Sequence, residues 1–387
     1  MSRISMVAIA VSAAAMIVVF SVLNGLTGLV QDLYKAFYPD VRVTAARGKF
    51  FPADSAKLNA IRAVPGMERL TTVIEDNVFA HNVLGEQKVV TLKGIDEEYL
   101  YVNGLHEYLD TLGEDSVSSG RPYTAIAGSR ILNELGADIT NVFSSIELFY
   151  INPDVKDAEL NPTEAFQSLE LHPAGRFSVQ EDLDGKYVLA PLQLVQSLFR
   201  AERQYSSIEI KTAPGEADKV RARVRSIMGN GYKVETRYEQ NRTMYMVIGS
   251  EKLAVYAILL LVLLIASFNM VGALAMLVLE KQKDIAILKA MGATAGAIRQ
   301  IFFLEGLLWS LAGGLAGIAV GTAVCVAQQV FGIIKLKGSF LVEEYPVTIQ
   351  ANDLLVVVAT IFGVGLLASW YPAMRATSVA EPALKGN

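Results

Sequence analysis

Four long runs of apolar residues are the strongest pattern along the chain. The first is Ile4 to Leu26, 23 residues without a charge, and the others are residues 253–279, 301–330 and about 354–371. At a rise of about 1.5 Å per residue, the first run reaches about 34 Å, enough to cross the hydrocarbon core of a bilayer. The pattern therefore predicts four transmembrane helices, with a large polar segment between the first two.

The first run continues at helical spacing beyond its apolar core. Leu29, Leu33 and Phe37 recur every four residues, which predicts that residues 4–37 form a membrane helix extended by a stalk. The alternative is a cleaved signal peptide with Arg3 as its charged region. Against it, the run is long for such a segment, and no convincing A-x-A cleavage site follows it.

Residues 38–250 mix strand-like and helix-like patterns. Residues 206–212 alternate apolar and charged positions, residues 214–228 repeat apolar positions at helical spacing, and residues 232–238 read as a strand. This β-α-β unit is typical of half of a ferredoxin-like fold. Other expected elements are strands at 41–44, 86–92 and 145–150, a helix ending at Gly136, and loops at 114–121 and 151–175. We predict an α+β domain of one or two subdomains.

Lysine and arginine residues in the short connections predict the orientation. The loop of residues 280–300 holds four basic residues, whereas the loop of residues 331–353 carries two lysines against three acidic residues. Because cytoplasmic loops are enriched in Lys and Arg, we expect residues 280–300 and both termini in the cytoplasm. Residues 38–250 then lie on the opposite side of the membrane.

Composition and motifs give no support for catalysis. The chain is 52% hydrophobic and has a net charge of −5, which disfavours a nucleic-acid partner. No P-loop, G-x-S-x-G, H-E-x-x-H or C-x-x-C motif occurs, the three histidines lie far apart, and the single cysteine, Cys325, cannot form an intrachain disulfide. The acidic residues of the 38–250 segment are scattered as on a solvated face. We predict a chain without catalytic residues, metal or cofactor of its own.

The third apolar run contains two kinds of candidate position. Glu305 is a carboxylate about one turn inside the run, where a packing or coupling role is favoured over a proton relay. Gly313, Gly317 and Gly321 recur every four residues and form a stripe that lets another helix approach closely. That helix belongs either to this chain or to a second subunit.

A short amphipathic helix, residues 280–292, is expected between the second and third runs. Its charged start comprises Glu280, Lys281, Lys283 and Asp284, and its apolar ridge comprises Ile285, Leu288 and Met291. Gly292 and Gly296 then allow a turn before the next span. Such a helix suits docking into a groove on a soluble partner, and the alternative is a helix that lies on the lipid surface.

Three stretches of this chain resemble the signature of FtsX-like ABC permeases. They are Phe268-Asn269-Met270, residues 280–293 (EKQKDIAILKAMGA) and Phe303-Leu304-Glu305-Gly306. Residues 4–9 (ISMVAI), 21–25 (SVLNG) and 127–130 (AGSR) narrow the resemblance to the lipoprotein-releasing type, LolC/LolE. The resemblance covers nearly the whole chain.

The resemblance implies an α-helical membrane protein with four transmembrane helices and a large MacB/FtsX-like α+β periplasmic domain inserted between helices 1 and 2. Residues 251–387 would form the FtsX-like permease domain in the bacterial inner membrane, with both termini cytoplasmic. The partners implied are a second permease chain, as a homodimer or heterodimer, and a separate ABC ATPase that binds ATP and Mg. Residues 280–292 would be the coupling helix seated in that ATPase.

The lipoprotein-releasing members use this arrangement to extract mature lipoproteins from the inner membrane and pass them to a periplasmic carrier. The resemblance implies that the acyl chains lie between the first two spans of the paired subunits. Removing acyl chains from lipid costs about 0.8 kcal/mol per CH₂, so an energy source is needed. The alternative within the superfamily is an FtsX- or MacB-like permease that transmits force to periplasmic partners or exports another substrate.

Overall fold

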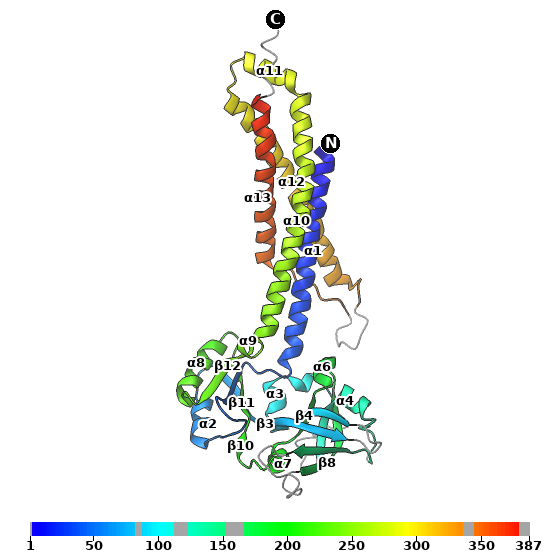
Figure 1. Cartoon of the computed structure of the whole chain (residues 1–387), viewed down its shortest axis with the longest axis vertical. Helices are drawn as coiled ribbons and strands as arrows, with labels where there is room; N and C mark the ends of the chain where they lie inside the picture. Colours follow the sequence, from blue (N-terminus) through cyan, green and yellow to red (C-terminus); the bar gives the residue numbers. More distant parts are fainter. Residues whose placement is uncertain are drawn as a thin grey trace. The chain divides into compact units, whose positions relative to one another are not determined.

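The computed structural model describes residues 2–81, 87–111, 123–141, 143–151, 166–335 and 344–378. Its backbone contacts divide the chain into two compact units (Figure 1). The helical unit comprises Met1–Val30, Met246–Lys337 and Val342–Asn387, and the mixed unit is mainly Gln31–Tyr245. The chain thus leaves the helical unit after the first span and returns to it with the second.

Among the described residues, four helices are long and apolar enough to cross a membrane. They are α1 (Ser2–Lys35), α10 (Arg242–Glu280), α12 (Ala295–Phe331) and α13 (Ala351–Ser378). The four predicted membrane helices are therefore confirmed. α1 continues without a break beyond Leu26, as expected for a stalk, and ends two residues before Phe37.

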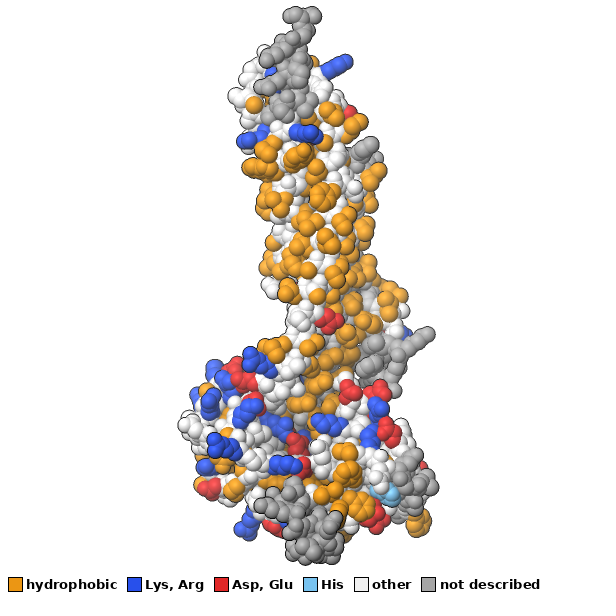
Figure 2. All heavy atoms as spheres, viewed as in Figure 1, with side chains coloured by type: hydrophobic (Ala, Val, Ile, Leu, Met, Phe, Trp, Pro, Cys, Tyr) orange, Lys and Arg blue, Asp and Glu red, His pale blue; other side chains and the backbone are white. Residues whose placement is uncertain are grey.

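The helical unit has an apolar interior and an apolar exterior. Its buried cluster takes Met16 and Phe20 from α1, Met270 from α10, Cys325 from α12 and Ile361 from α13. Large hydrophobic side chains also cover much of its outer surface (Figure 2). Because such a surface is unfavourable in water, it indicates a bundle that is solvated by lipid.

The mixed unit is built on a ten-stranded sheet. The strands follow the order β12 (Tyr232–Thr236), β1 (Val41–Ala45), β11 (Ser207–Thr212), β3 (Met67–His81), β4 (Gln87–Ile95), β9 (Tyr187–Pro191), β6 (Thr124–Gly128), β8 (Phe166–Phe177) and β5 (Leu109–Thr111). β7 (Ile146–Ile151) pairs with β3 and β8. The short strands β2 (Phe51–Pro52) and β10 (Gln204–Tyr205) form a separate ribbon. Most pairs are antiparallel, but β4–β9 and β6–β8 are parallel.

Helices flank this sheet, and they are short apart from α8. They are α2 (Ser55–Arg62), α3 (Tyr99–Val102), η1 (Leu105–Tyr108), α4 (Ser129–Glu134), α6 (Glu181–Asp184), α7 (Leu192–Leu198), α8 (Ala217–Met228) and α9 (Arg237–Gln240). α8 connects β11 to β12, and β1 lies between these two strands, antiparallel to both. The predicted β-α-β unit is therefore confirmed as a split unit. Gly136, at the end of α4, has a φ of +61°, as expected for a glycine cap.

β3 is shared by two hydrophobic cores. Its first half pairs with β11 and its second half with β4. One core packs Val43 and Ile210 against Val220 of α8, and the other includes Ile74 and Leu92. A single 15-residue strand thus joins both halves of the mixed unit.

Two expected boundaries were wrong. Residues 166–175, placed in a loop, belong to β8, where Leu169, Leu171 and Pro173 alternate inward with polar neighbours. Pro173 is tolerated because the register with β6 shifts beside it. The strand expected to reach residue 238 ends at Thr236, because a capping box between Thr236 and Glu239 starts α9 there. The expected loop at 114–121 lies outside the described residues.

Candidate functional site

The connection between the second and third spans contains α11 (Gln282–Ala290). The chain turns at Gly292, whose φ of +94° is a left-handed conformation that glycine adopts without strain. α12 then begins behind Thr294, whose side chain accepts a backbone hydrogen bond. Gly296 was expected in the turn but lies in the first turn of α12, because this cap starts the helix earlier.

The side chains that α11 exposes to a partner differ from those predicted from the sequence. Ile285 is 2% exposed and packs among side chains of α10, α12 and α13. The predicted ridge of Ile285, Leu288 and Met291 is therefore wrong at Ile285, which anchors α11 to its own chain. Leu288 is half-buried, whereas Met291 is 71% and Ile287 58% exposed. The exposed large apolar side chains of the segment are thus Ile287 and Met291.

The charged start of the 280–292 segment is open to solvent. Glu280, Lys281, Lys283 and Asp284 are all exposed. The Lys281 Nζ lies 3.0 Å from the Asp284 Oδ2, an ion pair of little energetic weight at an exposed site. The segment therefore presents charges and two large apolar side chains, and its one buried residue, Ile285, fixes it to three spans.

The glycine stripe of α12 lies against α1. A Cβ placed on Gly317 would lie 2.2 Å from the carbonyl oxygen of Ala10. Cβ atoms on Gly313 and Gly321 would lie 2.7 and 2.9 Å from carbonyl oxygens one turn of α1 to either side. The two helix backbones approach so closely only because these positions lack side chains. Of the two alternatives, the structure shows packing within this chain.

Glu305 lies on α12 with its side chain half-buried. It is adjacent to Gly306, where an added Cβ would meet the side chains of Ser369 and Leu274. Within the described ranges, no hydrogen bond or ion pair is found for the Glu305 carboxylate. Its packing or coupling role stays a prediction.

A polar cluster that the sequence patterns did not predict links three spans. The Lys252 Nζ lies 2.8 and 3.0 Å from the two carboxylate oxygens of Asp353 and 3.0 Å from the Asn24 Oδ1. The Asn24 Nδ2 donates to the Asp353 Oδ2 at 2.5 Å. Asp353 is only 7% exposed, so these two donors offset the cost of burying its charge. The cluster joins α1, α10 and α13 at the ends of their apolar runs.

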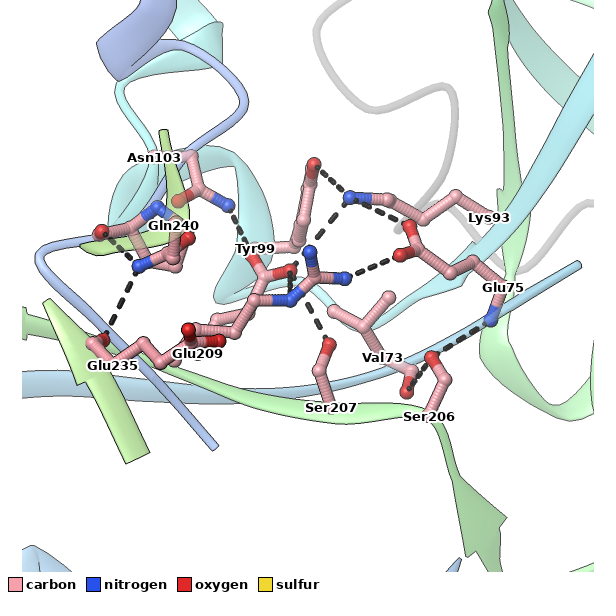
Figure 3. Close-up of polar contacts among 12 residues, drawn as sticks. Val73, Glu75, Lys93, Tyr99, Asn103, Ser206, Ser207, Glu209, Glu235 and Gln240 are labelled. Atoms are coloured by element: carbon pink, nitrogen blue, oxygen red, sulfur yellow. Dashed lines mark hydrogen bonds and ion pairs between the residues drawn. The ribbon is translucent and has the colours of Figure 1, made fainter. Parts of the chain in front are cut away.

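The mixed unit contains a second unpredicted cluster, in which four charged side chains meet where β1, β11, β3 and β4 adjoin (Figure 3). The Lys93 Nζ lies 3.1 Å from the Glu75 Oε2 and 3.7 Å from the Glu209 Oε1. Arg42 pairs with Glu75, and its Nε lies 3.8 Å from the Glu209 Oε1. We call these four residues the charge lock. Two positive and two negative charges balance within it.

The charge lock corrects the expectation that acidic residues of this segment lie on a solvated face. The side chain of Lys93 is 2% exposed and that of Glu209 0%. Neutral groups complete the network, since the Asn103 Nδ2 donates to the Glu209 Oε2 at 2.7 Å and the Lys93 Nζ donates to the Tyr99 hydroxyl at 3.2 Å. The alternating pattern of residues 206–212 placed Glu209 opposite the core, but both faces of β11 are covered.

Within the charge lock, neighbouring opposite charges favour the ionised forms of Glu75 and Lys93. Burial raises the pKa of Glu75, but the charges of Lys93 and Arg42 outweigh it and hold the pKa at about 2. Burial likewise lowers the pKa of Lys93, and the carboxylates of Glu209 and Glu75 outweigh it, so the pKa lies well above its usual range. Glu75 and Lys93 therefore carry their charges throughout the neutral range.

The depressed pKa of Glu75 predicts acid sensitivity of the mixed unit. A carboxylate with a folded pKa of about 2 and an ordinary value of 4.5 stabilises the fold above pH 5, and this contribution disappears as the pH falls toward 2. We expect a loss on the order of 3 kcal/mol at most. Unfolding temperatures of the purified chain at pH 7, 5 and 3 measure it, with Glu75→Gln as the reference. A pH dependence as steep in Glu75→Gln as in the wild type would contradict the assignment.

Two family matches cover most of the chain. Residues 2–227 match the family described as MacB-like periplasmic core domain, and residues 256–380 match the family described as FtsX-like permease C-terminal. The boundary between the matches falls between α8 and the apolar part of α10. The first match alone covers more than half of the chain.

Individual proteins similar to this chain carry related names. The lipoprotein-releasing system transmembrane protein LolC of Neisseria meningitidis is 25% identical over 403 residues, covering 99% of this chain and 92% of that protein. The corresponding protein LolE of Haemophilus influenzae is 26% identical over 404 residues, covering 99% and 93%. The solved periplasmic region of MacB from Actinobacillus actinomycetemcomitans is 12% identical, with a TM-score of 0.37, covering 56% of this chain and 98% of that one.

Proposed function

We propose a function on the premise that this chain belongs to the family with a MacB-like periplasmic core domain, here joined to an FtsX-like permease C-terminal domain. It is a membrane protein with a periplasmic domain, and its role is that of a permease subunit in an ABC transporter that releases lipoproteins from the inner membrane. The observation that carries the proposal is similarity over 99% of the chain to proteins named as lipoprotein-releasing subunits.

The orientation follows from the order of the spans. With a periplasmic domain between α1 and α10, the next connection, which contains α11, lies on the cytoplasmic side, and the termini lie there too. A separate ABC ATPase that binds ATP and Mg would dock on α11. Since Ile285 packs among α10, α12 and α13, a displacement of α11 would be transmitted directly into three spans.

The experiment that tests this function is a release assay. The chain is purified from its own membrane in mild detergent with the ATPase and second permease chain that accompany it, and is reconstituted with a triacylated lipoprotein. Release of the lipoprotein to a soluble periplasmic carrier is then measured with and without ATP. ATP-dependent release supports the proposal. ATP hydrolysis without release, with activation of a cell-wall hydrolase or export of another substrate, would replace it by the alternative superfamily roles.

If the ATPase docks on α11, a substitution on the exposed face of this helix should weaken docking without destabilising the fold. Ile287→Asp changes an exposed side chain, so we expect its free energy of unfolding to stay within about 0.5 kcal/mol of the wild-type value. Its unfolding temperature should therefore stay near that of the wild type. Release of lipoprotein should fall about ten-fold or more, the equivalent of about 1.4 kcal/mol of lost coupling. Reversing the charges of Lys283 and Asp284 together should act in the same direction.

The matched control for that prediction is Ile285→Asp on the same helix. Ile285 is buried in its own chain, so a charge there should lower the unfolding temperature, unlike the charge at position 287. Normal ATP-dependent release by Ile287→Asp and by the double charge reversal would exclude docking through this face of α11.

A further inference from the structure

The helical unit holds an apolar pocket between α1, α12 and residues 333–334 and 345–347. Its volume is about 430 Å³. Its lining includes Val18 and Val22 of α1, Val324 and Cys325 of α12, and Ile334 and Val347 beyond α12. Neither α10 nor α11 contributes to its wall, so it is separate from the docking helix.

The outer wall of the pocket is held in place by specific contacts. The Thr348 backbone N–H donates to the Ser21 carbonyl of α1 at 2.8 Å, and the Gln329 Nε2 of α12 donates to the Val347 carbonyl at 2.7 Å. A Cβ on Gly25 of α1 would lie 2.2 Å from the Pro346 carbonyl oxygen. The segment around Val347 is therefore fixed to both helices, and the pocket is a built feature of the fold.

The wall of the pocket has few polar groups that are available to bind water. Gln328 is the amide in the lining, and its Nε2 donates to the carbonyl oxygens of Ile334 at 2.9 Å and Tyr345 at 3.3 Å. Its Oε1 accepts a hydrogen bond from the Ile334 backbone N–H at 2.9 Å. Apolar cavities without available polar partners stay dry and take apolar ligands. The occupant that fits such a wall is a hydrocarbon.

The rim of the pocket faces lipid. Val324 is 52%, Ile333 70% and Ile334 61% exposed, on a helical unit whose outer surface is apolar. Val22 lies four residues before Leu26, where the apolar run of α1 ends on its way to the periplasmic domain. The pocket is therefore at the depth of the periplasmic leaflet.

We propose that this pocket binds one acyl chain of a phospholipid from the periplasmic leaflet. A cavity of about 150 Å³ with a comparable wall takes a benzene ring, so a volume of about 430 Å³ admits a considerably longer hydrocarbon. Phospholipid is the occupant because it surrounds the exposed rim at the highest concentration. The proposal goes beyond lipoprotein release and does not depend on it.

The test uses the full chain with its accompanying subunits in nanodiscs. These contain phosphatidylethanolamine that carries a photoreactive diazirine on one acyl chain. After irradiation, mass spectrometry should find labelling of residues 18–22, 324–328 and 345–347 several-fold above that of other lipid-facing peptides. Val22→Trp fills the pocket and should reduce this labelling several-fold. Val11→Trp is the matched control, since Val11 is a 64% exposed valine on the same helix, and it should leave the labelling unchanged.

Equal pocket labelling in Val22→Trp and wild type would overturn the proposal. So would preferential labelling of the pocket by a diazirine-bearing triacylated lipoprotein, with none by the phospholipid, because the source of the chain would then be the substrate. If Val22→Trp fails to fold, the wild type provides the second measurement. Its single cysteine, Cys325, lines the pocket and should react with N-ethylmaleimide several-fold more slowly in phospholipid nanodiscs than after delipidation. Equal rates would contradict the bound chain.

Discussion

Gly317→Ala is expected to destabilise the helical unit by about 3 kcal/mol, the upper end of the usual cost of overpacking. The added methyl group would lie 2.2 Å from the Ala10 carbonyl oxygen and 2.8 Å from the Ala13 Cβ. Neither is the end of a flexible side chain, so α1 and α12 must move apart. Thermal unfolding of the purified chain in mild detergent measures the effect.

Gly363→Ala is the matched control for this substitution. Gly363 lies within α13, and an added Cβ there would meet nothing within 4 Å. Alanine is also the better helix former, by up to about 1 kcal/mol, so the control should be neutral or slightly stabilising. An unfolding temperature of Gly317→Ala equal to that of Gly363→Ala would mean that α1 and α12 do not approach each other as described.

Lys93→Met is expected to destabilise the mixed unit by about 3–5 kcal/mol, the usual cost of removing one partner from a buried charge pair. Lys93 is 2% exposed and pairs with two carboxylates. Without it, Glu75 and Glu209 share the single positive charge of Arg42. Because β3 and β4 meet β1 and β11 at this point, we expect the two hydrophobic cores to separate at a lower temperature.

Two comparison variants distinguish the charge lock from ordinary surface pairs. Lys49→Met removes an ion pair with Asp76 in which the lysine is 61% exposed, and it should cost less than about 1 kcal/mol. The double variant Lys93→Met with Glu209→Gln restores charge balance, and it should recover part of the stability lost in the single variant. A Lys93→Met protein as stable as Lys49→Met would refute the charge lock as a stabilising element.

Acid and the substitution Lys93→Met both disturb the charge lock, but they change its net charge in opposite directions. Protonation of Glu75 leaves excess positive charge, whereas loss of Lys93 leaves excess negative charge. Both should therefore act on the junction at β3, and the helical unit should respond less to either change. This difference between the two units can be measured with a separate probe in each unit. Tryptophan fluorescence from Trp309 and Trp370 reports on the helical unit.

Elements with a local cause could be predicted from the sequence. A membrane span depends on the hydropathy of consecutive residues, so four runs were enough to predict four helices. The split β-α-β unit follows from apolar periodicity between residues 206 and 238. The turn at Gly292 and the close approach along Gly313, Gly317 and Gly321 follow from the absence of a side chain. The resemblance to lipoprotein-releasing permeases could likewise be recognised from local motifs such as residues 280–293.

Features that depend on distant partners were decided only by the tertiary structure. Periodicity places Ile285 on a face of α11, but which side chains cover that face depends on α10, α12 and α13. The sequence pattern predicts a solvated Glu209. In the fold, Glu209 lies buried beside Lys93, which is more than one hundred positions away in the chain. In the sequence, Lys252 and Asp353 are charged residues next to the ends of apolar runs. In the fold, they pair with each other and with Asn24. The sequence by itself thus determined the spans and their order, because helix formation in lipid is local. The tertiary structure decided which charges are buried, because a buried charge is stable only beside a partner that the fold supplies.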